Sequence, residues 1–228
     1  MAHYRRVGEV PHKRHTQHRR PDGGLYAEEL MGEEGFSSDS SLLYHRHLPS
    51  ALVDARPWVL PDQATVPNEP LLPRHLRLHD LTFPPGADAV RDRRLVLANA
   101  DVRISYVVAS APSPLYRNAT GDECLFVEAG SGVVETVFGP LAVHAGDHVV
   151  LPRATTHRWV PDGELRLYAV EANGHIAPPH RYLSRYGQLL ESAPYCERDL
   201  RAPGDLVTIE GRDVEVYVKH RGSRGLTG

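Results

Sequence analysis

A series of short segments with alternating apolar residues, beginning near residue 95, constrains the fold more than any other feature of the sequence. At Val102, Ile104, Tyr106 and Val108 every second side chain is apolar, which predicts a strand with one buried face. Similar apolar segments follow at 125–127, 133–137, 141–143, 149–151, 165–169 and 214–218, with turn residues at 129–132, 139–140, 145–147 and 161–163. Short strands at this spacing predict a β-sandwich or a β-barrel.

Composition agrees with a chain of many turns and excludes several classes of protein. The 228 residues include 19 Gly and 19 Pro, which favour short strands over long helices. The sequence has no run of about 18 apolar residues, so we expect no membrane span. A net charge of −3 does not favour nucleic-acid binding. Cys124 and Cys196 lack metal-ligand or redox spacing, which indicates a reducing, cytoplasmic setting.

Residues 1–90 lack the alternation and are predicted to form an irregular N-terminal extension. Six basic residues between positions 5 and 20 precede six acidic residues between 22 and 39. This strip can pair with itself or with a neighbouring subunit, whereas an RNA-binding arm would keep its excess positive charge. We interpret the histidines at 12, 15 and 18 as packed or solvated side chains rather than zinc ligands. Two acidic pairs are interpreted as salt-bridged or solvated surface, namely Glu28-Glu29 and Glu33-Glu34.

The chain is therefore predicted to have three parts: the extension at 1–90, a barrel at 91–218, and a tail at 219–228 that resembles an inter-domain linker. Residues 181–192 could add one or two helical turns. Trp58 and Trp159 are expected to be core or interface aromatics rather than platforms for a substrate.

Five residues at fixed spacing carry the strongest motif: Glu123, Gly130, Gly146, Pro152 and His157. This pattern resembles the paired motifs of the cupin family. The resemblance implies a mainly β, cupin-type jelly-roll barrel, in which the glycines form tight turns with positive φ and the proline ends a strand. It also implies that the carboxylate and the imidazole point inward from neighbouring strands.

The same resemblance argues against a metal in this barrel. Active cupins carry a His-x-His pair four or five residues before the glutamate, but residues 116–120 contain no histidine. Glu123 and His157 remain as vestigial positions, and we expect a buried, mutually hydrogen-bonded pair without a metal. Two ligands are too few for iron(II), so we assign no catalytic, cofactor-binding or metal-binding residue. An alternative is a metal held by Glu123, His157 and a nitrogen from His144 or His148.

Longer stretches give a closer resemblance, at 7–17, 24–32, 34–45 and 118–132. They are similar to the N-terminal half of homogentisate 1,2-dioxygenase in its bacterial form, and the similarity runs from about residue 4 to 221. Members of that family have a metal-free first half used for packing and oligomer assembly. Their second half holds iron(II) with two histidines and a glutamate, plus a histidine base, and cleaves homogentisate with O2 to maleylacetoacetate in tyrosine and phenylalanine breakdown. The family's Fe(II) ligands therefore have no counterpart among these residues.

Three functions are compatible with the sequence. The chain could be the structural half of a split or truncated dioxygenase, with the catalytic C-terminal half as its partner. It could be a stand-alone, metal-free binding or scaffold module, with a small aromatic or acidic ligand near Arg117, His157 and Arg158. It could be an independent metalloenzyme of the kind described above. We expect a homo-oligomer, with the region around Tyr44 and His45 packed against another subunit or half.

Overall fold

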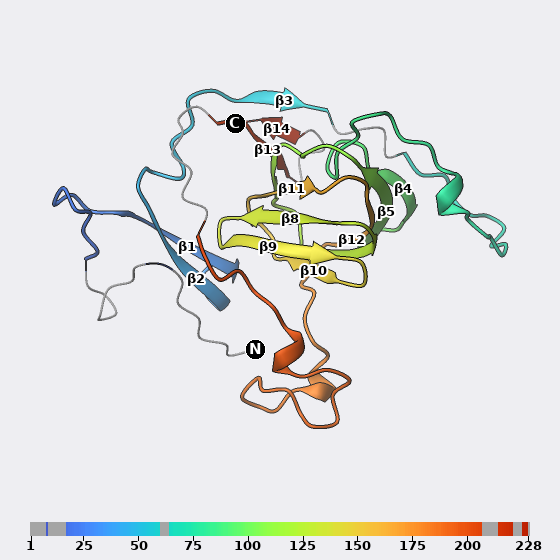
Figure 1. Ribbon diagram of the computed structural model, residues 1–228. Helices are drawn as coiled ribbons and strands as arrows, with labels where there is room; N and C mark the ends of the chain where they lie inside the picture. Colours follow the sequence, from blue (N-terminus) through green and yellow to red (C-terminus); the bar gives the residue numbers. More distant parts are fainter. Residues whose placement is uncertain (1–7, 9–16, 60–63, 207–213, 221–224, 228) are drawn as a thin grey trace.

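The alternating segments form two β-sheets on either side of an apolar core (Figure 1). The computed structural model describes residues 8, 17–59, 64–206, 214–220 and 225–227. The five-stranded sheet has the order β10-β7-β12-β5-β4. Its strands are β4 (Arg94–Ala98), β5 (Val102–Ala109), β7 (Glu123–Ala129), β10 (His148–Leu151) and β12 (Leu165–Ala172).

The facing sheet has seven strands in the order β3-β14-β13-β6-β11-β8-β9. Its strands are β3 (Arg56–Trp58), β6 (Leu115–Asn118), β8 (Ser131–Thr136), β9 (Gly139–His144), β11 (His157–Pro161), β13 (Val216–Lys219) and β14 (Gly225–Thr227). The pairing of β13 with β6 is parallel, whereas the other neighbours in both sheets are antiparallel.

The core forms where inward side chains of the two sheets meet. In β12, Leu165, Leu167 and Ala169 are fully buried and alternate with partly exposed residues. They belong to one apolar cluster with Leu125 of β7 and Trp159 of β11. The predicted mainly β, cupin-type jelly-roll barrel is thus confirmed, and so is the core position of Trp159. Trp58 packs edge-on against Tyr217, with ring centroids 4.9 Å apart.

The strand predicted from residue 102 is present, but its core-facing side was wrongly assigned. Val107 and Ala109 of β5 join the core cluster, so the predicted residues Val102, Ile104, Tyr106 and Val108 point to the opposite face. That second face is also covered, because the ring of Phe83 lies 6.2 Å from the ring of Tyr106. A strand covered on both sides carries apolar residues at both its odd and its even positions, so alternation alone cannot identify its inner face.

Two turns of the cupin-like motif have the backbone that the sequence predicts. Gly130 has a φ of 88° and Gly146 a φ of 96°. At Gly130 a Cβ atom would lie 2.1 Å from the carbonyl oxygen of Glu164, so the turn also requires the absence of a side chain. Ala154, which lies between Pro152 and His157 of the motif, adopts a φ of 67° and therefore carries backbone strain.

The N-terminal extension is more regular than predicted. Strands β1 (Ala27–Glu34) and β2 (Ser37–His45) form an antiparallel hairpin beside the barrel, and β3 joins the seven-stranded sheet (Figure 1). His18 stacks on Tyr26 at 4.8 Å, as expected for a packed histidine. The histidines at 12 and 15 and the basic residues at 5, 6, 13 and 14 lie outside the described residues.

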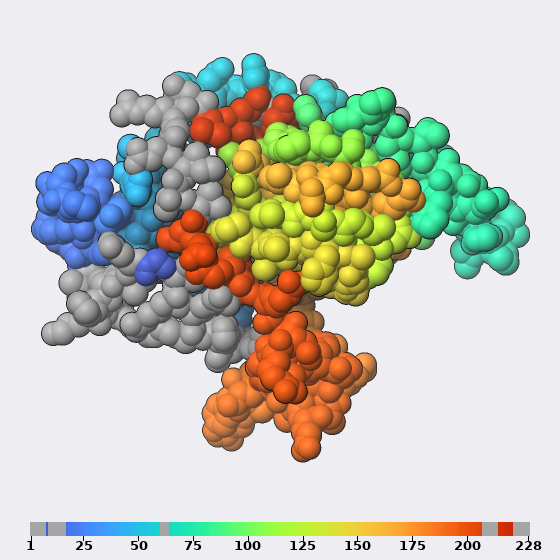
Figure 2. All heavy atoms as spheres, in the orientation of Figure 1, coloured from blue at the N-terminus to red at the C-terminus, as the bar shows by residue number. Residues whose placement is uncertain are grey.

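The boundary predicted at residue 218 falls inside β13, and the described residues 225–227 of the predicted tail form a strand of the seven-stranded sheet. Strand β14 pairs with both β13 and β3, so residues 225–227 do not form a linker. The segment that follows β12 stands out from the barrel (Figure 2) and contains two short 3-10 helices, η2 (His180–Tyr182) and η3 (Glu197–Asp199). A third 3-10 helix, η1 (Leu78–Asp80), precedes the barrel. None of the helices in the described residues is long and apolar enough to cross a membrane.

Candidate functional site

Four charged side chains lie inside the barrel, where the sequence predicts Glu123 and His157. Arg93, Glu123, Glu171 and Lys219 are each at most 10% exposed, and we call them the interior charge cluster. Arg93 Nη2 donates to Glu123 Oε2 at 3.0 Å, and Arg93 Nη1 donates to Glu171 Oε1 at 3.1 Å. Lys219 Nζ donates to the other oxygen of Glu171. Two cations and two anions leave the cluster formally neutral.

The sheet register explains why two carboxylates need cations here. Glu123 begins β7 and lies opposite Glu171 of the neighbouring β12. Like charges directly opposite on paired strands repel each other, and burial increases the cost of leaving them unpaired. Arg93 precedes β4 and Lys219 ends β13. The cluster therefore connects the two sheets through the barrel interior.

Glu123 has both oxygens engaged by the protein. Asn118 Nδ2 donates a hydrogen bond to Glu123 Oε1 at 2.8 Å, and Arg93 Nη2 donates one to Oε2. Asn118 lies five residues before Glu123, at a position where an active cupin has a histidine of its His-x-His pair. Burial alone would raise the pKa of Glu123, but its charged and hydrogen-bonding partners, of which Arg93 is the strongest, together outweigh burial and hold that pKa below its ordinary value.

His157 does not bond to Glu123, and the predicted mutual hydrogen bond is wrong. The side chain is buried, and its Nδ1 donates to the carbonyl oxygen of Thr155 at 3.0 Å. Nε2 has no hydrogen-bond partner in the described residues. Burial lowers the pKa of His157, and the nearby Glu123 only partly opposes this, so the neutral imidazole is favoured. Glu123 instead accepts hydrogen bonds from Arg93 and Asn118, which occupy both of its oxygens.

The histidines considered as a third metal ligand lie away from the interior. His144 is 66% exposed and pairs with Asp147 at 3.3 Å, while His148 is exposed and packs on Phe126 at 4.7 Å between ring centroids. The alternative prediction, a metal held by Glu123, His157 and a nitrogen of His144 or His148, is therefore wrong. In the described part of the chain, the interior brings no three ligand atoms within 4.8 Å of one another. Because a guanidinium already bonds both interior carboxylates, these residues do not fit iron(II).

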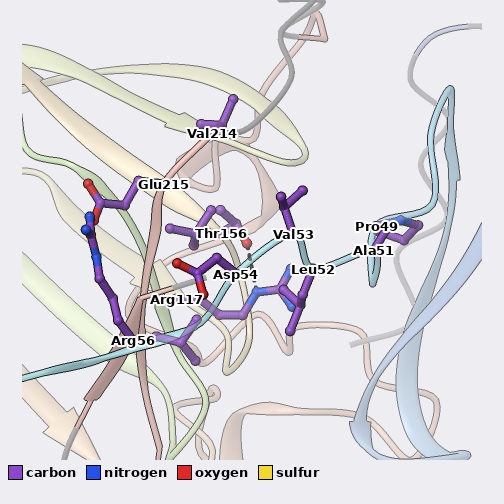
Figure 3. A pocket seen from close by; sticks show the side chains of 12 residues that line it. Pro49, Ala51, Leu52, Val53, Asp54, Arg56, Arg117, Thr156, Val214 and Glu215 are labelled. Carbon is purple, nitrogen blue, oxygen red and sulfur yellow. Dashed lines mark hydrogen bonds and ion pairs between the residues drawn. The ribbon is translucent and has the colours of Figure 1, made fainter.

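A cavity of about 400 Å³ lies on the outer side of the seven-stranded sheet, under the segment that precedes β3 (Figure 3). Arg117 lines this cavity, and its Nε donates to Thr156 Oγ1 at 2.8 Å. The other two residues predicted for a ligand site are elsewhere. His157 faces the interior, and Arg158 pairs with Glu135 of β8. Successive residues of a strand point to opposite faces, which separates His157 from its neighbours.

Sequence reasoning missed Arg93, Asn118, Glu171 and Lys219. The sequence did contain a signal for Glu171, because it comes two residues after Ala169 in the alternating series Leu165, Leu167 and Ala169, which predicts that its side chain also points inward. No comparable signal marks Arg93, which lies in a turn region and reaches the cluster only in the folded chain.

The fold and the interior thus define a cupin-type barrel whose central carboxylates are neutralised by side chains of the same chain. No family model matches the sequence. The chain is 34% identical over 205 residues to a protein of Saccharolobus solfataricus named "Putative dioxygenase SSO1533". That alignment covers 89% of this chain and 52% of the relative, so the chain spans about half the length of the relative that it matches.

Solved structures with cupin domains are also similar to parts of the chain. A cupin-2 domain protein from Shewanella frigidimarina is 18% identical, with a TM-score of 0.34, and the match covers 36% of this chain and 79% of that one. An RmlC-like cupin protein from Desulfovibrio desulfuricans is 18% identical, with a TM-score of 0.39, and the match covers 45% and 98%. The fold assignment rests on the strands and sheets described above.

Proposed function

We propose that this chain is the structural half of a ring-cleaving enzyme of the homogentisate 1,2-dioxygenase type, and that it does not cleave the ring by itself. The observation that carries the proposal is the interior charge cluster, in which Arg93 occupies the carboxylates of Glu123 and Glu171. The similarity to a dioxygenase-named protein of about twice the length supports the enzyme class. The long resemblance described in the sequence analysis supports homogentisate as the substrate of the complete enzyme.

The chemistry of the cluster explains the assignment to a non-catalytic half. In the complete enzyme, iron(II) in the other half would bind homogentisate and O2 together. A guanidinium has no lone pair, no open coordination position and no accessible redox change, so Arg93 cannot substitute for that ion. What Arg93 can do is neutralise two buried carboxylates and hold β7 and β12 against the rest of the barrel.

The extension offers surface for the proposed partner half or for further copies of the chain. Several of its large apolar side chains are more than 85% exposed, namely Phe36, Val66 and Leu71. We propose that these side chains contribute to contacts with the partner half or with another copy of the chain. Both cysteines are free thiols, which supports the reducing, cytoplasmic setting.

Oxygen uptake tests this function. The purified chain is incubated with iron(II) and homogentisate, alone and together with the polypeptide of a neighbouring reading frame that carries a His-x5-Glu pattern and a downstream histidine. We expect no uptake above the protein-free rate for the chain alone and ring cleavage for the mixture. Homogentisate-dependent uptake by the chain alone, with iron bound at one per chain, would overturn the proposal. So would a mixture in which both chains fold and associate without any uptake.

The cavity beside Arg117 supports a second candidate, a metal-free module that binds a small carboxylate. Its volume of about 400 Å³ lies within the usual range for a small-molecule site. Titration of the chain with homogentisate in a calorimeter tests this candidate. Binding that is lost in Arg117→Gln but retained in Arg158→Gln would support it, because Arg158 pairs with Glu135 outside the cavity. Equal behaviour of the two variants would exclude it.

A further inference from the structure

We propose that Glu33, Asp122 and His175 form a divalent-cation site that fastens the N-terminal hairpin to the barrel. Glu33 belongs to β1 of the hairpin, Asp122 immediately precedes β7, and His175 follows β12. One ligand atom from each residue lies within 4.8 Å of the other two. The site is separate from the interior charge cluster and does not depend on the function proposed above.

The distances fit ligands around one cation better than they fit hydrogen bonds. His175 Nδ1 lies 3.6 Å from Asp122 Oδ2 and 3.9 Å from Glu33 Oε1. Hydrogen bonds between such atoms are about 2.7–3.2 Å long. Two ligands at about 2.1 Å from a tetrahedral cation are themselves about 3.4 Å apart. A small inward movement of these side chains would therefore give a three-ligand site with a fourth position for water.

The opposite edge of the same imidazole faces a further carboxylate. His175 Nε2 lies 3.6 Å from Glu34 Oε1. A histidine that binds a metal through one nitrogen usually donates its other N–H to a carboxylate, a carbonyl or a water. A small approach of Glu34 would let it accept that proton, which would leave the lone pair of Nδ1 directed towards Asp122 and Glu33.

The two carboxylate ligands are already oriented by other bonds. Asp122 is 2% exposed, and its Oδ1 and Oδ2 accept backbone N–H groups of Arg153 and Ile176, each at 2.8 Å. Glu33 Oε2 accepts the hydroxyl proton of Ser38 at 3.1 Å, which leaves Oε1 for a ligand. Each ligand oxygen retains a lone pair, because a carboxylate oxygen can accept two bonds.

Charge favours a cation at this position. In the described part of the chain, the ion pairs of Glu33, Glu34 and Asp122 are all with His175. Arg153 also reaches the hairpin, but its guanidinium bonds the backbone carbonyl of Glu33 and not a carboxylate. Three carboxylates around one imidazole attract a divalent ion. A donor set of one nitrogen and two oxygens suits Zn²⁺ or Mn²⁺ better than Mg²⁺.

A cation here would stabilise the attachment of the hairpin. A two-stranded hairpin is at best marginally stable on its own in water. The proposed ligands lie on both sides of the junction, since Glu33 comes from the hairpin and the other two come from the barrel. Metal binding would therefore order the hairpin against the barrel rather than alter the barrel core.

Calorimetric titration of the metal-free chain with ZnCl2, and separately with MnCl2, tests the proposal. We expect one site per chain whose affinity falls at least 100-fold in His175→Gln and about 10-fold in Glu34→Gln. His144→Gln is the matched control, because His144 is exposed and pairs with Asp147 away from this site. Zinc that binds elsewhere on the chain would persist in every variant, and the His144→Gln titration measures that background.

Hydrogen exchange of the hairpin gives an independent readout. We expect zinc to slow exchange at residues 27–45 in the unaltered chain and in His144→Gln, but not in His175→Gln. The proposal is overturned if no zinc or manganese binds, or if His175→Gln binds as the unaltered chain does. Binding without slower exchange of the hairpin would overturn its fastening role. These measurements involve no oxygen chemistry, so their failure is distinguishable from failure of the proposed dioxygenase role.

Discussion

Removing the guanidinium of Arg93 should destabilise the barrel strongly at neutral pH. Arg93→Met keeps most of the side-chain volume but leaves Glu123 and Glu171 adjacent, with Lys219 as their remaining cation. The substitution removes the hydrogen bonds to both carboxylates, which are worth about 1.5–3 kcal/mol each, and a third from Arg93 Nε to the carbonyl oxygen of Ala89. Breaking a buried ion pair by removing one partner costs about 3–5 kcal/mol. We therefore expect the free energy of unfolding at pH 7 to fall by about 3–5 kcal/mol.

The loss of unfolding free energy caused by Arg93→Met should become smaller as the pH falls. In the unaltered chain, burial raises the pKa of Glu123, and its partners, of which Arg93 is the strongest, together lower it by more. Without Arg93 the burial effect dominates, so the folded-state pKa of Glu123 rises above its unfolded value. A carboxylate of this kind costs stability at high pH and ceases to do so once it is protonated. The difference between Arg93→Met and the unaltered chain should therefore shrink as the pH falls from 7 to 4.

Urea unfolding followed by tryptophan fluorescence measures this difference, since Trp159 is fully buried in the core. Arg158→Met is the control, because it breaks a partly exposed pair with Glu135 that is worth at most about 1 kcal/mol. Adding Glu123→Gln to Arg93→Met should restore part of the lost stability, because it removes one unpaired buried charge. A loss below about 1 kcal/mol at pH 7, or a loss that does not change with pH, would refute this account of the cluster.

Three further predictions concern the motif residues. Ala154→Gly should stabilise the barrel by about 0.5–1 kcal/mol in urea unfolding, because relief of a positive φ outweighs the entropy cost of glycine; a lower midpoint would contradict it. Gly130→Ala should destabilise it by more than about 2 kcal/mol, since the added Cβ would meet the carbonyl oxygen of Glu164. Glu123→Gln should cost most stability at pH 6 and progressively less towards pH 3, because a lowered folded-state pKa contributes stability that disappears on protonation; a cost independent of pH would contradict this.

Alternation and turn residues were sufficient to predict most of the barrel, since inward leucines such as Leu165 and Leu167 repeat at every second position. They failed where a strand is covered on both faces, as β5 is by Phe83. They also failed for the hairpin at 27–45, whose strands carry mixed polar and apolar residues with little burial. Such strands pair through their backbones, and side-chain periodicity records burial rather than pairing.

The candidate site was predictable only in its two motif positions. Glu123 points inward with the buried Leu125 two residues along β7, and His157 with the buried Trp159 two residues along β11, so the alternation of each strand fixes these positions locally. Their partners depend on contacts between distant segments. Arg93 lies 30 residues before Glu123, and Lys219 lies 48 residues after Glu171. No local pattern relates such residues, so the choice of Arg93 and Lys219 as the neutralising cations could be identified only in the folded chain.

That choice has a physical consequence for the whole barrel. Two carboxylates placed opposite each other inside a barrel require positive charge in order to fold at neutral pH. When a metal supplies the charge, its binding free energy is also folding free energy, and its removal weakens the fold. Arg93 and Lys219 supply the charge covalently, so the barrel can reach its native packing without an ion. A metal site at Glu33, Asp122 and His175 would then act mainly on the attachment of the hairpin, because Asp122 directly precedes Glu123 but, among the described residues, no ion pair joins the proposed ligands to the interior charge cluster.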